Sequence, residues 1–387
     1  MSFEAFEDRL AEIDRQSRRR RLKESTLDGV DLRTPDGKRL LNFGGNDYLG
    51  VVAAQSTGAP QRPVGPIPSG ASASSLVCGW SSHHEQLANA IARLERCESA
   101  VVFPSGYAAC SGAVATLCQP DDLILSDQLN HASLIDGCRM SKATKEVYPH
   151  RDVDFVERTL RSQRSKFASV WIVTDGVFSM DGNMAPLVAL SDLAAKYNAQ
   201  LIVDEAHGTG VLGPSGGGLC EALQLQDRIP IRIGTLSKAI GHQGGFVAGP
   251  QIVVDYLVQF CRSLIYSTAL SPVVADGARE VIESMQGWQE RREHVASLSR
   301  SFRTAMKIPG SGGAVEAGIP IVPVIVGSDE KTVALSSHLR EQGFYVPAIR
   351  PPTVPEGTAR LRVSISAAHT RDQINSLVNV LKQSSPH

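Results

Sequence analysis

The residues best suited to chemistry lie in two segments of the chain, 201–210 and 234–241. The first is an apolar run that ends in Asp204 and is followed by His207, and the second is an apolar run that leads to Lys238. A lysine amine can form a Schiff base with an aldehyde, a carboxylate can keep a pyridine nitrogen protonated, and a histidine can hydrogen-bond a phenolic oxygen. Pyridoxal 5′-phosphate (PLP) needs these three groups, so the segments predict a PLP site at Lys238. The alternative is a buried strand-end aspartate and an ordinary surface lysine.

A phosphate-binding turn is predicted upstream of both segments. Ser105, Gly106 and Tyr107 follow an apolar run and open a helical stretch. Backbone N–H groups at such a helix N-terminus suit a dianion. Thr235, in the second segment, can add a hydroxyl to the same phosphate. On its own, the Ser-Gly pair would indicate a plain turn.

His131 follows the next apolar run, within the segment 127–133. A histidine at this point can lie flat on the pyridine ring of the cofactor and cover it. The alternative is a partly buried histidine with a structural role, and this would be favoured if His131 were the only indication.

Two arginines near the C-terminus, Arg360 and Arg362, alternate with apolar residues and therefore share one face of a predicted strand. The guanidinium group is a planar fork that suits the carboxylate of an amino acid. The alternative is a pair of surface arginines on an edge strand.

A second cationic group is the run of four arginines at residues 18–21. Phe3, Phe6, Leu10 and Ile13 recur before it at helical spacing, which predicts an amphipathic N-terminal helix that ends in the run. The arginines are then either a solvated helix C-terminus, where cations suit the helix dipole, or a contact for an anionic substrate.

These groups need a scaffold that brings strand ends together. From about residue 84, helical patterns alternate with short apolar runs, which predicts an α/β fold with a mainly parallel central sheet and helices on both faces. The runs are continuously apolar, as in strands that are buried on both faces. The carboxyl ends of such strands face the ligand crevice, so Asp204 and Lys238 can converge. The predicted strands are Ala100–Phe103, Leu123–Leu125, Ser169–Thr174, Gln200–Val203, Arg232–Gly234 and Phe246–Ala248.

A smaller α+β C-terminal domain is predicted after about residue 276. Its elements are a long polar helix over Val274–Met306, a strand over Ile319–Val326, a helix near Lys331–Gln342, strands over Phe344–Ala348 and Arg360–Ser366, and a last helix from Thr370. We expect three parts: an N-terminal helix and substrate-contacting segment over 1–50, a large cofactor-binding domain over 51–275, and the small domain over 276–387. Residues 51–70 hold four prolines and are expected to form an irregular connection.

The composition limits the classes of protein to which the chain can belong. Of its 387 residues 42% are apolar, and its formal net charge of −1 disfavours nucleic acid as a partner. The chain has no apolar run of about 18 residues, so we expect no membrane span. The first 22 residues lack the apolar core of a secretory signal. The seven cysteines are scattered and never spaced as C-x-x-C, which favours buried thiols in a reducing cytoplasm over disulfides or a metal site.

The sequence resembles the α-oxoamine synthases of PLP fold type I over nearly its whole length. The matching motifs are Asn42–Gly50, Asn130–Leu134, Asp175–Gly182, Asp204–Gly210, Thr235–Lys238, Leu264–Thr268 and Ile349–Arg362. The last segment is the most specific, because its sequence Arg-Pro-Pro-Thr-Val-Pro is typical of family members that use alanine and a pimeloyl thioester.

The resemblance implies roles for residues of the cofactor site. Lys238 would be the Schiff-base lysine and the acid/base at the substrate α-carbon, Asp204 would pair with the pyridine nitrogen, and His207 would contact the phenolic oxygen. His131 would stack on the ring and contact the substrate. The resemblance further assigns Gly106, Tyr107 and Thr235 to the phosphate, Ser179 to the pocket wall, and Ser267 and Thr268 to the phosphate of a neighbouring subunit.

The resemblance also implies a substrate site and a homodimer with active sites at the subunit interface. Asn46 and Arg362 would hold the amino acid, and Thr353 would lie near the acyl substrate. Arg20 is the best candidate for the family's N-terminal substrate arginine, although four adjacent arginines leave its register open.

Three departures from the family pattern lie around the substrate entrance. Asp175 stands where glutamate is common, so a contact made by the longer acid is lost or bridged by water. Ser75 stands where many members have arginine, and the proline-rich stretch 51–70 replaces a segment that is usually helical. These differences affect the expected substrate more than the expected cofactor.

The implied activity is that of a PLP-dependent C-acyltransferase, which condenses an amino acid with an acyl thioester and releases carbon dioxide. L-Alanine and a pimeloyl group on coenzyme A or a carrier protein are favoured. Glycine or serine remain alternatives, as in 2-amino-3-ketobutyrate ligase, 5-aminolevulinate synthase, serine palmitoyltransferase and autoinducer synthases, because one methyl group changes binding by only about 1–3 kcal/mol. An aminotransferase and a non-catalytic PLP-binding regulator are the more distant alternatives.

Overall fold

The computed structural model describes residues 3–57, 66–308 and 313–384. The chain divides into two compact units. The smaller comprises residues 1–60, 180–182 and 293–387, and the larger comprises residues 61–179 and 183–292. The expected N-terminal segment thus falls in the same unit as the C-terminal residues. The three-part division stays a prediction, since compactness does not test whether the segment 1–50 acts separately.

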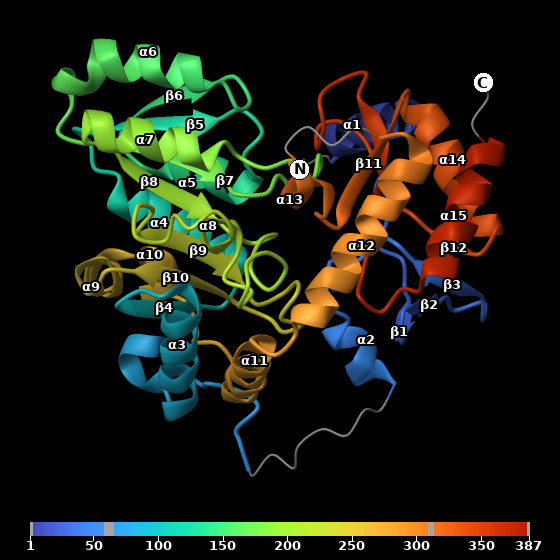
Figure 1. The fold of residues 1–387 in the computed structure, drawn as a ribbon, viewed down its shortest axis with the longest axis horizontal. Coiled ribbons are helices and arrows are strands. Elements are labelled where there is room, and N and C mark those ends of the chain that lie inside the picture. Colours follow the sequence, from blue (N-terminus) through green and yellow to red (C-terminus); the bar gives the residue numbers. More distant parts are fainter. Residues whose placement is uncertain (1–2, 58–65, 309–312, 385–387) are drawn as a thin grey trace. The chain divides into compact units, whose positions relative to one another are not determined.

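The larger unit is built on a seven-stranded sheet with the order β4-β10-β9-β8-β7-β5-β6 (Figure 1). Only β10 runs antiparallel to its neighbours, β4 and β9, so the sheet is mainly parallel, as predicted. The strands are β4 (Ser99–Phe103), β5 (Leu123–Asp127), β6 (Thr144–Tyr148), β7 (Val170–Asp175), β8 (Gln200–Asp204), β9 (Ile231–Thr235) and β10 (Gly245–Gly249).

The continuous apolar runs arise because the central strands have no solvent face. In β8, for example, Leu201, Ile202 and Val203 are all at most 2% exposed. Successive side chains point to opposite faces. Ile202 packs in one cluster with apolar residues of α4 (Gly106–Leu117) and α5 (Ala132–Met140), so these two helices cover one face.

The remaining helices of the larger unit connect and flank these strands. They are α3 (Ser82–Glu95), α6 (Val153–Gln163), α7 (Leu187–Tyr197), α8 (Leu219–Ala222), α9 (Gln251–Phe260), α10 (Arg262–Ile265) and α11 (Pro272–Met285), with a π-helical turn at Ser75–Gly79 and a 3-10 turn at Arg164–Lys166.

The smaller unit has two small sheets, β1-β2-β3-β12 and β11-β14-β13. Its strands are β1 (Thr26–Asp28), β2 (Asp31–Arg33), β3 (Arg39–Asn42), β11 (Ile321–Gly327), β12 (Phe344–Tyr345), β13 (Ala348–Ile349) and β14 (Ala359–Ser364). Its helices are α1 (Glu4–Arg15), α2 (Val51–Ser56), α13 (Gly313–Ala317), α14 (Asp329–Glu341), α15 (Arg371–Ser384) and most of α12 (Gln289–Met306).

All six strands predicted for the large domain are confirmed, and β6 is the strand that the apolar pattern missed. Thr144, Lys145 and Glu146 make β6 polar, and it lies at the edge of the sheet, where one side of the strand meets water. The long helix predicted over Val274–Met306 is wrong in one respect. The chain turns at Gln286–Trp288, where Gly287 disfavours helix, and forms α11 and α12 instead.

Two predictions about the N-terminal region are also corrected. The first helix ends at Arg15, because Ser17 adopts a left-handed conformation with φ 55°, so residues 18–21 are not a helix C-terminus. Residues 51–56 form α2, although an irregular connection was expected from residue 51. Residues 58–65 of that connection lie outside the described residues.

His369 is a buried histidine that ties together the core of the smaller unit. Its ring stacks on Phe43 with the ring centroids 4.2 Å apart, and its Nε2 lies 3.1 Å from the backbone oxygen of Asn42. Its Nδ1 accepts a hydrogen bond from the backbone N–H of Ser366. Burial lowers the pKa of His369 from 6.5 to about 4. The folded protein therefore holds this imidazole neutral.

We predict that His369 makes the free energy of unfolding fall between pH 6.5 and 4. The unfolded chain binds a proton there and the folded chain does not, so stability is lost as the pH falls, by about 3 kcal/mol over the window. Urea titrations at several pH values measure the effect. His369→Gln should flatten the profile relative to wild type, whereas the same change at the exposed His338 should leave the slope as it is. Equal slopes in all three proteins would contradict the prediction.

Candidate active site

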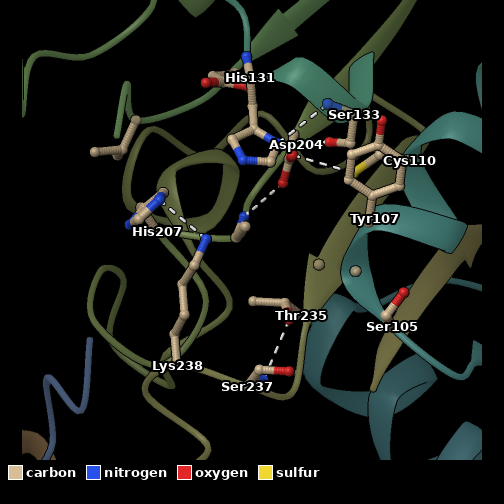
Figure 2. Close-up of a pocket in the computed structure, with 15 residues that line it drawn as sticks. Ser105, Tyr107, Cys110, His131, Ser133, Asp204, His207, Thr235, Ser237 and Lys238 are labelled. Atoms are coloured by element: carbon tan, nitrogen blue, oxygen red, sulfur yellow. Dashed lines mark hydrogen bonds between the residues drawn. The ribbon is translucent and has the colours of Figure 1, made fainter. Parts of the chain in front are cut away.

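The carboxyl ends of β7, β8 and β9 and the N-termini of α4 and α5 surround a cavity of about 270 Å³ (Figure 2). Eight of the predicted cofactor residues line it together: Ser105, Gly106, Tyr107, His131, Asp204, His207, Thr235 and Lys238. The topology explains this convergence, because parallel strands present their carboxyl ends at one edge of the sheet.

Lys238 extends into the cavity from the loop after β9, and its Nζ lies 2.9 Å from Nε2 of His207 (Figure 2). His207 comes from the loop after β8 and is 6% exposed. The two residues therefore form a hydrogen-bonded pair, with an amine that can bond covalently to an aldehyde and an imidazole beside it that can share its proton.

Asp204 is the last residue of β8 and is 5% exposed. Its Oδ1 accepts a hydrogen bond of 2.8 Å from the backbone N–H of Ala206. Its Oδ2 lies 3.1 Å from Sγ of Cys110, on α4. A buried carboxylate is costly unless it is hydrogen-bonded or paired with a cation. These two donors compensate part of the cost of burial, and Asp204 also lines the cavity, where a cationic group of a ligand could reach it.

The turn before α4 has the geometry of a phosphate cradle. Ser105 caps the helix, since its side chain accepts a hydrogen bond from the backbone N–H of Ala108. A Cβ added to Gly106 would lie 3.0 Å from the side chain of Thr235, so glycine lets the two segments approach closely without a crowded contact. Exposed N–H groups at a helix N-terminus attract a dianion. Tyr107 also lines the cavity, while its hydroxyl donates to the carboxylate of Asp136.

His131 caps α5 and faces the same cavity. Its Nδ1 accepts a hydrogen bond of 3.3 Å from the backbone N–H of Ser133 and lies 2.7 Å from the Ser133 hydroxyl oxygen. Burial lowers the pKa of His131, and the cation of Lys238 lowers it further, while Asp204 acts in the opposite direction. The imidazole is thus neutral, and because Nδ1 accepts, its proton is on Nε2.

Asp175 ends β7 directly beside Asp204 on β8. Its Oδ1 accepts a hydrogen bond of 3.3 Å from the backbone N–H of His131, and its Oδ2 is buried without a protein hydrogen-bond partner. Burial and the neighbouring Asp204 raise the pKa of Asp175 well above its usual range. Asp175 therefore orients the loop that carries His131, and its burial beside Asp204 favours the protonated form of its carboxyl group.

The residues present fit PLP. The cavity brings together four groups that PLP needs. Lys238 offers an amine for the aldehyde, Asp204 a carboxylate for the pyridine nitrogen, His131 a neutral imidazole, and the N-terminus of α4 a site for the phosphate. The buried Oδ2 of Asp175 supplies one more polar atom that lacks a protein partner. Within the described ranges, no group of three or more metal-ligating side chains was found, and no helix is long and apolar enough to cross a membrane.

Three predicted cofactor residues do not line this cavity in the described part of the chain. Ser179 follows β7 by four residues. Ser267 and Thr268 follow α10, and Thr268 pairs with Ser74 in an isolated β-bridge. Their cofactor roles therefore stay predictions.

The predicted amino acid residues Asn46 and Arg362 meet in the smaller unit. Arg362 is 5% exposed and donates hydrogen bonds to Oδ1 of Asn46 at 3.1 Å and to the hydroxyls of Tyr48 and Ser364. β14 is the central strand of its sheet, and Arg360 is also buried, paired with Asp181. The alternative of surface arginines on an edge strand is therefore wrong.

The predicted acyl-side residues Arg20 and Thr353 also meet in the smaller unit. Nη2 of Arg20 donates to the Thr353 hydroxyl at 3.2 Å. Arg18, in contrast, forms ion pairs with Asp329 at 2.7 Å and Glu356 at 2.5 Å. Two acidic partners neutralise Arg18, so the contact with Thr353 favours Arg20 among the four adjacent arginines.

The sequence patterns missed several residues of the cavity wall, notably Cys110, Ser133, Ala206 and Ser237. Ser133 and Ser237 lie within motifs that were identified, so proximity in the chain could have found them. Cys110 is three residues after Tyr107 on α4 and carries no signal of its own. Only the packing of α4 against β8 brings its thiol to Asp204.

Fold and site together define a PLP enzyme of fold type I. A model of the family described as aminotransferase class I and II matches residues 38–381. Solved structures agree: a serine palmitoyltransferase with a PLP internal aldimine superposes with a TM-score of 0.87 at 27% identity, over 99% of this chain and 97% of that one. The 8-amino-7-oxononanoate synthase of Francisella tularensis superposes with a TM-score of 0.71 at 25% identity, over 89% and 97%.

Sequence relatives narrow the assignment. The chain is 43% identical to the 8-amino-7-oxononanoate synthase of Marinobacter nauticus, over 91% of this chain and 89% of the relative. It is 40% identical to 8-amino-7-oxononanoate synthase 2 of Bacillus subtilis, over 91% and 90%. The chain belongs to the aminotransferase class I and II family and, within it, to the α-oxoamine synthases that include these enzymes. The resemblance, the fold class and the cofactor predicted from the sequence are thereby confirmed.

We predict that Asp175→Asn binds PLP nearly as well as wild type, whereas Asp175→Ala binds it about tenfold more weakly. Asparagine reproduces a neutral side chain with an acceptor for the His131 N–H, but alanine removes this hydrogen bond, which is worth about 1 kcal/mol. Titration of the cofactor-free protein with PLP measures the dissociation constants. Equal weakening in both variants would show that Asp175 acts as a charge.

Proposed function

We propose that this chain condenses L-alanine with a pimeloyl thioester, with loss of carbon dioxide, to form 8-amino-7-oxononanoate in biotin biosynthesis. The observation that carries the proposal is an intact Lys238, His207, Asp204 and His131 set in a chain 40–43% identical to enzymes named for that product. PLP, when bound, supplies the electron sink that makes the amino acid α-carbon acidic.

The side chains of the larger unit move and hold protons in this proposal. Nζ of Lys238 takes the α-proton of alanine and later returns a proton to the same carbon. His207, 2.9 Å from that Nζ, accepts or supplies a proton as the amine changes charge. Asp204 would hold the proton on the pyridine nitrogen of bound PLP. The neutral His131 would cover the ring, and its Nε2–H can donate to a carbonyl oxygen of either substrate.

The smaller unit holds the two substrates in this proposal. Arg362, anchored by Asn46 and Tyr48, binds the alanine carboxylate. Arg20 and Thr353 contact the acyl substrate. The new bond joins the alanine α-carbon to the thioester carbonyl carbon and expels the thiol. The resulting β-keto acid then loses its carboxylate as carbon dioxide.

A homodimer completes the proposed site. Val77 is 77% exposed and Tyr266 is 71% exposed, and the Ser74–Thr268 bridge joins the two segments that carry them. An exposed apolar patch next to Ser267 and Thr268 suits contact with a second copy of the chain. Ser267 and Thr268 would then reach the phosphate of the cofactor bound by that second copy. Sedimentation velocity tests this arrangement, because a homodimer should sediment with twice the 41.5 kDa mass of the chain.

We place the reaction in the cytoplasm, consistent with seven free cysteines.

The test of the proposed function is product formation from defined substrates. Holoenzyme with L-alanine and pimeloyl-CoA, or a pimeloyl-carrier protein, should release the thiol and yield 8-amino-7-oxononanoate, identified by mass spectrometry. Lys238→Ala should lose both the product and the visible absorption band. The high structural similarity to serine palmitoyltransferase makes serine with palmitoyl-CoA the second substrate pair to assay. Turnover of that pair, or of glycine, in preference to alanine would overturn the assignment.

We predict that Arg362→Lys raises the KM for alanine by about 10- to 100-fold, because lysine cannot form the two parallel hydrogen bonds of a guanidinium with a carboxylate. The KM for the acyl thioester should change little. Arg360→Lys is the matched control, since Arg360 is equally buried on the same strand face but pairs with Asp181. Similar KM changes in both variants would contradict a carboxylate-binding role for Arg362.

A further inference from the structure

Cys110 lies against the carboxylate that would hold the ring nitrogen of the cofactor. It is on α4, is 3% exposed, and lines the cavity together with Lys238 (Figure 2). Its Sγ is 3.1 Å from Oδ2 of Asp204, within the range for a hydrogen bond to sulfur. The sequence suggested only a small buried thiol. The geometry gives it a polar partner inside the site.

The direction of this hydrogen bond follows from the surroundings. Burial, and then the carboxylate of Asp204, raise the pKa of the Cys110 thiol well above its usual range. A thiolate here would place two negative charges in contact away from water. The thiol therefore keeps its proton and donates it to Oδ2, while the backbone N–H of Ala206 donates to Oδ1. One donor on each oxygen fixes the plane of the Asp204 carboxylate.

The strength of the donor matters because Asp204 must also bind the pyridine nitrogen. Each hydrogen bond to a carboxylate stabilises its charge and reduces its attraction for another proton. A hydroxyl or amide at this position would compete strongly, but a thiol is a weak donor. Cys110 can thus orient Oδ2 and leave most of its basicity for the cofactor. Asp175, Lys238 and His131 also face Asp204, and the substitutions below leave them in place.

We propose that Cys110 is a positioning residue for Asp204: its thiol fixes the orientation of the carboxylate and, by donating weakly, sets how firmly the pyridine nitrogen keeps its proton. α4 then acts on both ends of the cofactor, since its first turn forms the phosphate cradle and its second turn orients the carboxylate. The inference rests on PLP as the cofactor and not on the choice of amino acid or acyl substrate.

The first test is the pH titration of the visible absorption band of the bound cofactor. A protonated pyridine nitrogen lowers the pH at which the imine beside Lys238 loses its proton. Cys110→Ser, a stronger donor, should weaken the hold on the ring proton and raise the midpoint by about half a pH unit. Cys110→Ala removes the donor and should shift the midpoint in the opposite direction. The control is Cys138→Ala, a cysteine of equal burial in the same core cluster but outside the cavity wall, and it should leave the midpoint unchanged.

The outcomes separate positioning from packing. Midpoints that move in opposite directions for serine and alanine support the proposal. Midpoints that stay at the wild-type value, or that move together as a packing defect would make them, overturn it. No acyl substrate is needed for this titration, so its result is independent of the proposed reaction.

The second test observes the thiol without any cofactor. The infrared S–H stretching band of Cys110, isolated as the difference between wild type and Cys110→Ala, should lie below the frequency of a free thiol. It should move upward in Asp204→Asn, because a neutral amide is a weaker acceptor than a carboxylate. A band at the free-thiol frequency in the otherwise native protein would show that the contact with Asp204 is absent, and would overturn the proposal.

Discussion

The site depends on a single constraint: the Asp204 carboxylate is buried at the end of a central strand. A buried carboxylate must be compensated by hydrogen bonds or by a cation. The protein supplies one donor to each oxygen, from Ala206 and Cys110, and bound PLP would supply the cation. Asp175 lies beside Asp204 and lines the same cavity, and its burial together with the charge of Asp204 raises its pKa well above the usual range.

The burial of whole strands explains why much of the fold could be predicted. A strand such as β8 must be apolar on both faces, and this leaves a short uninterrupted run in the sequence that ends at Asp204. The functional residues follow such runs directly, so strand ends and site residues were identified together. Lys238, His207 and His131 could be predicted in this way from the sequence alone. The edge strand β6 has no such apolar run, because it is partly exposed to water and carries polar residues.

What could not be predicted depends on contacts between distant segments or on local backbone conformation. The Cys110–Asp204 contact joins residues on different elements, and no spacing in the chain encodes it. The raised pKa of Asp175 follows from its burial beside Asp204, which is a property of the pairing of β7 with β8. The end of α1 and the turn between α11 and α12 depend on one or two residues each, Ser17 and Gly287, within otherwise helical patterns.

His131 combines two tasks in one side chain, and this affects how any mutational survey of the site should be interpreted. Its Nδ1 caps α5 through the Ser133 N–H, and its ring faces the cofactor cavity. An alanine at this position removes a helix cap, worth about 1 kcal/mol, together with the cover of the ring. A loss of activity would then combine a displaced helix with missing chemistry. Asparagine keeps a capping oxygen and discards the ring, so it is the substitution that isolates the contribution of the imidazole.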